Sequence, residues 1–179
     1  MDFYNVIEKR TSNKTYKSTA IPTEKLDKMI HAALMAPSWK NETCYRFVFI
    51  NDSTQKEKIA SAILNDDNEA VNAVMSAPLV AIIVGNPSES GTIDGKPYFM
   101  IDCGIAMEHL ILAATNEGYG TCWIGSFDES AIRMILNIPS KFRVVAMTPI
   151  GETEENDEHY PPKDTSSHIY YNRWENTDR

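Results

Sequence analysis

The sequence has few of the features that mark secreted, membrane-bound or metal-binding proteins. Its 179 residues contain three cysteines, Cys44, Cys103 and Cys122, which form neither an even disulfide set nor a CxxC metal motif. No basic and apolar leader opens the chain. No stretch reaches the roughly 18 apolar residues of a membrane span. We therefore expect reduced thiols, a cytoplasmic location and no membrane partner.

Positive charge is also scarce. The chain has 17 Lys and Arg against 25 Asp and Glu, which gives a formal net charge of −8, and its pI is about 5.0. Nucleic-acid-binding surfaces need basic stripes that displace counterions, so we expect no nucleic-acid partner. The average field repels anionic ligands, so any phosphate site must be a local cluster of cations.

The familiar catalytic motifs are missing as well. The chain has no GxSxG elbow, no HExxH and no P-loop. Its four histidines lack a companion at metal-ligand spacing, and we expect no metal site. One of them, His109, falls within an apolar helical stretch, which is typical of a core histidine with a hydrogen-bond partner.

The composition that remains is ordinary for a globular protein, with 42% hydrophobic and 23% charged residues. Its length suits one domain spanning residues 1–179, since domains usually run to ~100–200 residues. Helices among strands predict an α+β or α/β fold with helices on a central sheet. From residue 152 the chain becomes acidic and poor in apolar residues, so 152–179 is expected to form a tail.

Hydrophobic periodicity predicts the individual elements. The helices are expected at 2–9, 23–36, 53–64, 69–75, 102–117 and 128–136, with Asp2, Thr23, Ser53 and Asp128 as N-caps. The strands are expected at 47–50, 79–84, 121–124 and 143–150, and a surface loop at 86–96. The 102–117 helix is apolar almost all round, which predicts a place at the centre of the fold or at a subunit interface.

The segment Arg10–Lys14 carries the first candidate binding residues. In an extended loop Arg10, Ser12 and Lys14 point the same way, so a guanidinium, a hydroxyl and an ammonium can converge on one anion. A solvated polar loop remains the alternative interpretation.

Two further segments combine an aromatic residue with a turn. Residues 36–41 end a helix, and Trp39 is unusual in a polar turn because large aromatic side chains usually pack on something. Residues 118–127 hold three glycines that allow close backbone approach, and Trp123 and Ile124 could form the wall of a flat ligand site. A helix stop and a tight helix-to-strand turn explain these segments equally well, and the glycines do not match a dinucleotide motif.

Taken in order, these segments resemble the FMN-dependent nitroreductase family over nearly the whole chain. The family's Arg-x-Ser-x-Arg/Lys pattern is met at 10–14, and its Ala-Pro-Ser-x-x-Asn pattern at 36–41. Asp102 and Gly104 match an Asp-x-Gly helix start. Residues 118–125 match Gly-x-Gly-Thr-Cys-Trp-Ile-Gly, and 170–174 look like the terminal segment of smaller members.

The resemblance implies a three-layer α+β fold whose central, mainly antiparallel sheet is flanked by helices. It implies an intertwined homodimer with FMN at two interface sites, and a tail, residues 152–179, that packs on the partner subunit. The implied cofactor-binding residues are Arg10, Thr11, Ser12, Lys14, Pro37, Ser38, Trp39, Asn41, Trp123, Ile124, Gly125, Ser126 and Lys163. Among them Pro37, Ser38 and Asn41 would come from the partner chain. Lys14 and the Gly125 N–H would tune the flavin, and no side chain would act as a nucleophile.

The activity implied is that of an FMN-dependent oxidoreductase. It would take a hydride from NAD(P)H onto flavin N5 and pass two electrons to a small nitroaromatic or quinone acceptor by a ping-pong mechanism. Two alternatives stay open: a dehalogenase-like reductase of the same fold, and a flavin-binding store or redox sensor.

Some positions depart from the family pattern. Thr43-Cys44-Tyr45 replaces the usual Gln-Pro-Trp, and His109 replaces an Asn. Either Asn68 or Asn72 could supply a further flavin contact. Residues 86–98 are expected to be too few for a substantial lid, which predicts an open acceptor site.

Overall fold

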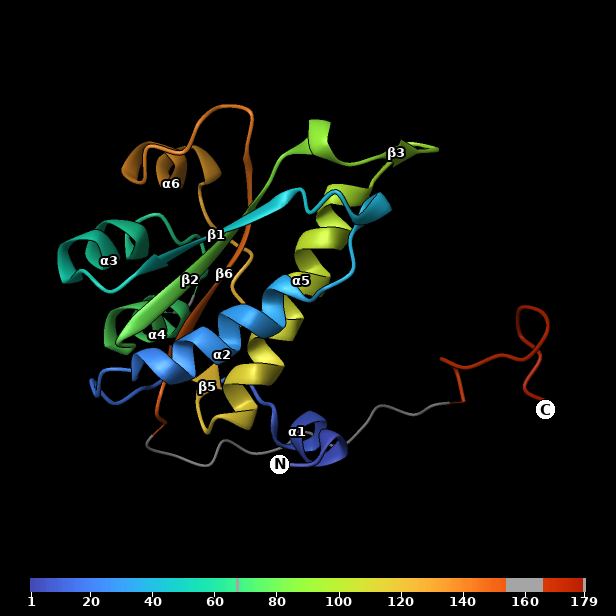
Figure 1. Ribbon diagram of the computed structural model, residues 1–179, viewed down its shortest axis with the longest axis horizontal. Coiled ribbons are helices and arrows are strands. Elements are labelled where there is room, and N and C mark those ends of the chain that lie inside the picture. The colour runs from blue at the N-terminus through green and yellow to red at the C-terminus, as the bar shows by residue number, and fades with distance from the viewer. Residues whose placement is uncertain (67, 154–165, 179) are drawn as a thin grey trace.

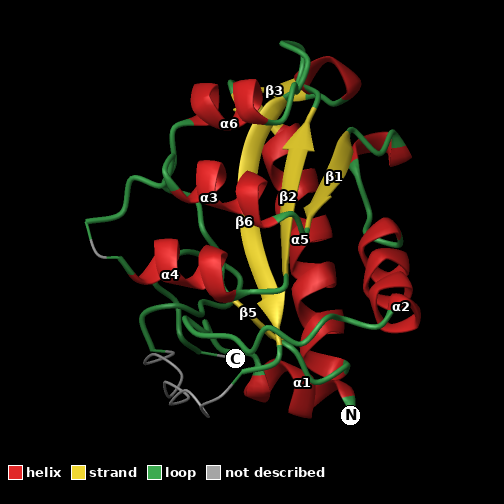
Figure 2. Ribbon diagram, turned by 90° about the vertical axis from the view of Figure 1, so that its left-hand side faces the viewer, coloured by secondary structure: helices red, strands yellow, loops and turns green. Residues whose placement is uncertain are grey.

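A four-stranded antiparallel sheet lies between two layers of helices (Figures 1 and 2). The computed structural model describes residues 1–66, 68–153 and 166–178. The sheet has the order β1-β2-β6-β5, formed by β1 (Tyr45–Ile50), β2 (Leu79–Gly85), β6 (Arg143–Gly151) and β5 (Gly120–Thr121). A separate hairpin is made of β3 (Thr92–Ile93) and β4 (Lys96–Pro97). The predicted three-layer α+β architecture is confirmed.

Helices cover both faces of the sheet, as Figure 2 shows. One layer consists of α3 (Ser53–Ala60), α4 (Glu69–Ser76) and α6 (Glu129–Ile135). The other consists of α2 (Thr23–Leu34) and α5 (Tyr98–Asn116). The short helix α1 (Phe3–Lys9) contacts α5, and two 3-10 turns, η1 (Trp39–Asn41) and η2 (Pro87–Glu89), lie before β1 and after β2.

The strand β2 explains why both faces are covered. All seven of its residues are buried, as predicted for a continuous apolar run. Side chains alternate along a strand, so Leu79, Ala81 and Ile83 join the core beneath α2 and α5. The intervening Val80, Ile82 and Val84 join the core beneath α3, α4 and α6. A strand that is apolar on both sides thus requires a helix layer on each side.

Of the four predicted N-cap residues, two are correct and two are wrong. The carboxylates of Asp2 and Asp128 accept backbone N–H groups of their own first turns, as expected of N-caps. Thr23 is already the first helical residue, and it makes no cap bond. Ser53 is also inside its helix, because Asp52 caps it by accepting the Gln55 N–H at 2.8 Å.

The longest helix, α5, begins four residues earlier than predicted. Pro97, which suits a helix start because it lacks an N–H, directly precedes it. One side of α5 packs into the core, whereas Met100 and Ile101 are exposed. The length and hydropathy of α5 would also fit a membrane span, but α2 and the sheet pack against it. His109 Nδ1 lies 3.1 Å from the Ala32 carbonyl oxygen, which is the partner expected for a core histidine.

Candidate functional site

The segment Arg10–Lys14 lies against the short strand β5. Ser12 forms a parallel bridge with Thr121, and the buried Asn13 donates its backbone N–H to the Thr121 oxygen at 2.8 Å. Gly120 allows this approach, since a Cβ at that position would overlap the Asn13 side chain. Gly120 of the 118–125 motif is therefore needed to bring the predicted anion clamp, formed by Arg10, Ser12 and Lys14, against the sheet.

The segment Trp123–Ser126 forms a ledge beside this clamp. Ile124 exchanges backbone hydrogen bonds with Met147 of β6, at 2.9 and 3.0 Å, and its side chain is buried. The neighbouring Trp123 points the other way and is 44% exposed. Gly125 is exposed, and its N–H donates to no group within the described residues. The ledge thus presents an indole and a backbone donor to the outside.

Residues 63 and 64, which follow α3, also contact the ledge and the residue after it. The Leu64 N–H donates to the Ser126 oxygen at 3.0 Å, and Ile63 forms an antiparallel bridge with Phe127. This pairing explains why α3 ends at Ala60 and not near residue 64 as predicted. Residues 63–64 and the segments 10–14 and 121–127, all far apart in sequence, therefore converge.

Acidic residues accompany both described cations of the clamp. Lys14 Nζ lies 2.9 Å from Glu69 Oε2 at the start of α4. Arg10 follows α1 near Glu108 of α5: burial raises the pKa of Glu108, and the charges of Arg10 and His109 oppose that rise. Each of these two cations therefore has a carboxylate nearby that lies outside the acidic tail.

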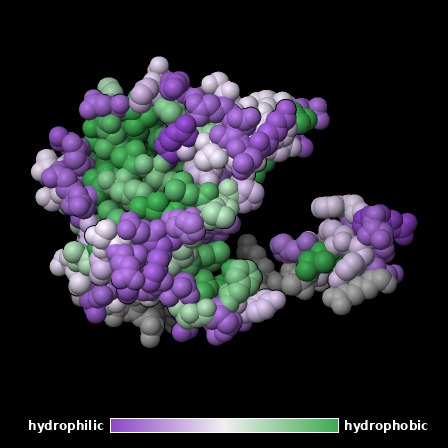
Figure 3. Space-filling model, in the orientation of Figure 1, coloured by the Kyte–Doolittle hydropathy of each residue, from purple (hydrophilic) through white to green (hydrophobic). Residues whose placement is uncertain are grey.

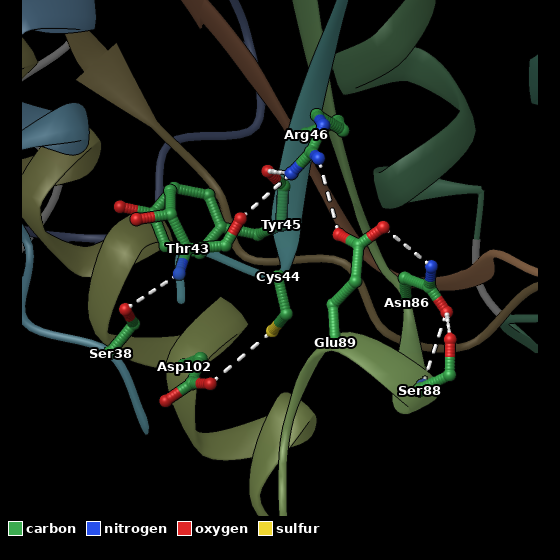
Figure 4. A network of polar contacts seen from close by, with 9 residues as sticks. All are labelled: Ser38, Thr43, Cys44, Tyr45, Arg46, Asn86, Ser88, Glu89 and Asp102. Carbon is green, nitrogen blue, oxygen red and sulfur yellow. Dashed lines mark hydrogen bonds and ion pairs between the residues drawn. The ribbon is translucent and has the colours of Figure 1, made fainter. Parts of the chain in front are cut away.

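The turn from Ser38 to Thr43 has an unusual backbone. Lys40, Asn41 and Thr43 have φ values of 47°, 59° and 50°, a region that costs energy for residues other than glycine. Ser38 Oγ accepts the Thr43 N–H at 2.9 Å, which closes the turn (Figure 4). Such conformations persist only where surrounding contacts impose them, and they concentrate at functional sites.

The buried carboxylate of Asp102 holds this turn to α5. One oxygen accepts the Trp39 N–H at 2.9 Å, and the other accepts the Ser90 hydroxyl at 3.0 Å and the Cys44 thiol at 3.2 Å. Burial, and then the bond to Asp102, raises the pKa of Cys44 to about 12, so this thiol stays protonated. Asp102 thus connects α5 with the segments around Trp39, Cys44 and Ser90. The sequence identified it only as the start of a helix.

The connection between β2 and α5 contains more structure than the predicted surface loop. Its first part is fixed by Glu89, which binds Arg46 at 3.2 Å and Asn86 at 2.8 Å (Figure 4). Farther on, the rings of Trp39 and Tyr98 lie with centroids 4.5 Å apart. Trp39 thus packs on this connection, as expected for a large aromatic side chain in a turn. Whether residues 86–98 leave the acceptor site open stays a prediction.

The two predicted halves of the site do not meet within one chain. The turn η1 packs near the N-terminal end of α5, whereas β5 and α1 lie toward its C-terminal half (Figure 1). From Asp102 to Asn116 the helix rises about 21 Å, at ~1.5 Å per residue. Pro37, Ser38 and Asn41 are therefore separated from Arg10, Ser12 and Lys14, and Lys163 lies outside the described residues.

Sequence reasoning missed two residues of these clusters, Asp102 as an anchor and Glu69 as the partner of Lys14. Asn68 and Asn72, the two candidates for a further contact, flank Glu69 on the first turn of α4. The start of α4 was predicted correctly, but spacing alone could not tell which side chain near this start lies against Lys14.

Comparison with known proteins gives a consistent family assignment. The model of the nitroreductase family matches residues 7–152. A nitroreductase family protein from Clostridium novyi NT is 45% identical, with a TM-score of 0.85 and coverage of 98% of this chain and 97% of that one. An FMN-dependent nitroreductase from Clostridium difficile R20291 is 25% identical, with a TM-score of 0.84 and coverage of 96% and 100%.

Curated sequences extend the comparison to named activities. A protein of Methanothermobacter thermautotrophicus, named provisionally as an NADH dehydrogenase/NAD(P)H nitroreductase, is 29% identical over 160 residues, which cover 87% of this chain and 80% of the relative. Iodotyrosine deiodinase 1 of Rattus norvegicus is 25% identical over 178 residues, with coverage of 84% and 61%.

Proposed function

The chain belongs to the nitroreductase family, and from this premise we propose that it couples oxidation of NAD(P)H to two-electron reduction of a nitroaromatic or quinone acceptor in a ping-pong cycle. The observation that carries the proposal is the convergence of residues 10–14 with 121–127, which joins a segment with two cations to a segment with an exposed indole and an exposed backbone N–H. For a nitro acceptor the balance is R–NO2 + NAD(P)H + H⁺ → R–NO + NAD(P)⁺ + H2O.

The residues of this cluster fit FMN, the cofactor supported by the family and its FMN-dependent member. A guanidinium and an ammonium suit a phosphate and the electron-rich edge of a pyrimidine ring. When bound, FMN supplies reversible acceptance of a hydride at N5 and its delivery as two electrons to the acceptor. The protein needs only to bind, orient and tune it, which agrees with the missing nucleophile and metal motifs.

Individual roles follow from position. Arg10, with Thr11 and Ser12, would hold the phosphate and ribityl side, and Lys14 would face the pyrimidine side of the ring. The indole of Trp123 and the backbone at Ile124 and Ser126 would line the ring's other side. The Gly125 N–H, which has no acceptor among the residues that the structure describes, is suited to hydrogen-bond at N5.

We propose that a homodimer completes the site, with Pro37, Ser38 and Asn41 of the partner subunit closing it. The separation of the two halves along α5 supports this, as does apolar surface on α1 and α5, where Phe3, Tyr4, Ile7, Met100 and Ile101 are exposed. A contiguous exposed apolar patch marks an interaction surface, and Phe3, Tyr4 and Ile7 lie together on the short helix α1.

The tail is proposed to pack on the partner. Figure 1 draws residues 166–178 apart from the domain. Among the described residues the edge strand β1 pairs only with β2, and Val48 and Phe49 line a cavity of about 270 Å³ beside it. Figure 3 shows a broad hydrophobic area in the region of β1. Gln55 Oε1 lies buried at this cavity without a hydrogen-bond partner among the described residues. A docked strand would cover the apolar area and supply that oxygen with a donor.

The decisive experiment measures flavin content and its reduction. The purified protein should carry FMN that denaturation releases, and NADH or NADPH should bleach its absorbance near about 450 nm within stopped-flow times. A nitroaromatic or quinone should then restore it. Bound FMN that neither donor reduces would contradict the enzyme and favour the store or sensor. Halide release from a halophenol by the reduced protein, without turnover of nitroaromatics, would favour the dehalogenase-like alternative that the deiodinase relatives suggest.

The phosphate role of Arg10 has its own test. Loss of a charge-assisted contact in R10A should weaken FMN binding by about tenfold to a hundredfold, measured by flavin fluorescence. K9A, which removes the exposed lysine directly before Arg10, is the matched control. Equal affinities of R10A and K9A would refute the role assigned to Arg10. The cytoplasmic location remains our proposal, supported by three buried cysteines that form no disulfide within the described residues.

A further inference from the structure

The ion pair between Lys14 and Glu69 places a carboxylate inside the proposed site. The two groups lie 2.9 Å apart, and their side chains are 40% and 59% exposed. Glu69 opens α4, whose preceding loop is held to the ledge by the bond from Leu64 to Ser126. Lys14 follows the segment held to Thr121. Both sides of the pair thus have backbone bonds to residues 121–126 close by in sequence, at Leu64 and at Asn13, which places the carboxylate within the proposed site.

We propose that Glu69 sets the reduction potential of the bound flavin by opposing the charge of Lys14. The proposal rests on the proposed function, in which Lys14 faces the pyrimidine side of FMN. Reduction adds two electrons and one proton to the ring, so the ring gains one negative charge. A cation beside it favours that change, and a carboxylate beside the same cation disfavours it.

The consequence is a flavin that is harder to reduce and a stronger reductant once reduced. In the free chain water screens both charges, because both side chains are substantially exposed. A ring and a partner subunit covering them would displace that water and lower the local dielectric, which strengthens the effect. Glu69 therefore favours electron delivery to acceptors that accept electrons reluctantly, as nitro groups do.

The variant E69Q tests the proposal through the potential itself, measured by anaerobic titration of the FMN-loaded protein against a redox dye. Glutamine keeps the length and polarity of the side chain and removes its charge. We expect reduced FMN to bind about tenfold more tightly relative to oxidised FMN, which corresponds to a rise of ~30 mV for a two-electron couple. Direct measurement of the two dissociation constants should give the same ratio, because potential and affinity are linked.

Two further variants separate charge from structure. E69D retains the carboxylate and should keep the wild-type potential, whereas E57Q removes an exposed carboxylate on the neighbouring helix α3 and should leave it unchanged. An unchanged or lowered potential in E69Q that still binds FMN would overturn the role of Glu69. Absence of FMN binding in the wild-type chain would instead overturn the proposed function.

Discussion

Replacement of Asp102 by alanine should loosen the turn that carries Ser38 and Asn41. The carboxylate accepts three donors, from Trp39, Ser90 and Cys44. Two of them, an amide and a hydroxyl, make charge-assisted bonds of about 1.5–3 kcal/mol each, and the thiol bond is weaker. Removal of the carboxylate also removes its own desolvation cost, which offsets part of the loss. We expect D102A to lose about 2–4 kcal/mol of unfolding free energy.

The isosteric variant D102N separates the charge from the contacts. Its amide oxygen can still accept the Trp39 N–H, and the Ser90 hydroxyl can reverse and accept from the amide nitrogen. We expect a loss of about 1 kcal/mol. D27A, on the exposed face of α2, should be neutral within ~0.5 kcal/mol.

Urea unfolding followed by circular dichroism measures these differences, at a fixed protomer concentration because a dimer's stability depends on it. FMN affinity should fall in the same order, D102A below D102N, because the turn loses its attachment to α5. Equal stability of D102A and D102N would show that the three bonds do not hold the turn. A large loss in stability with unchanged FMN affinity would show that the turn does not serve the cofactor.

Two other predictions concern groups outside the site. Hydrogen bonds from Arg143 hold the pKa of Glu129 below its ordinary value. Their stabilising contribution is therefore present above about pH 4.3 and is lost as the pH falls through the lower pKa of the folded state. In E129Q the unfolding free energy should fall less steeply at acid pH, and an unchanged acid dependence would contradict this. Burial raises the pKa of the Cys44 and Cys103 thiols. A thiol reagent at about pH 8 should therefore leave both unmodified in the native protein and modify them after unfolding. Rapid modification of these two thiols in the native protein would show that they are accessible or ionised.

Much of the secondary structure could be predicted because it depends on local patterns. The apolar run at 79–84 predicted a strand buried on both faces, and Asp2 and Asp128 predicted helix starts through side-chain bonds within their own first turns. The errors arose where the deciding contact is distant. The helix α3 stops at Ala60 because the following residues pair with Ser126 and Phe127, which no periodicity near residue 60 reveals.

The residues of the candidate site could likewise be predicted only in part. The motifs at 10–14 and 118–125 could be found in the sequence because binding an anion and a flat ring requires specific residue types: cations, hydroxyls and glycines. The structure joins the two segments through Ser12 and Thr121, and their role in binding stays a prediction. Neither the partner of Lys14 nor the anchor of Trp39 could be predicted, since Glu69 and Asp102 lie 55 and 63 residues away from them.

By itself the sequence determined the chemical groups of this protein and the family to which it belongs, and it predicted the residues that would hold a phosphate and a ring. The net charge of −8 predicted that the surface as a whole repels anions, so a phosphate site required a local cluster of cations. Only the tertiary structure decided where those groups stand. It set Glu69 against Lys14, and it placed the two halves of the site along α5, because packing on a shared sheet fixes distances that neighbours in sequence cannot.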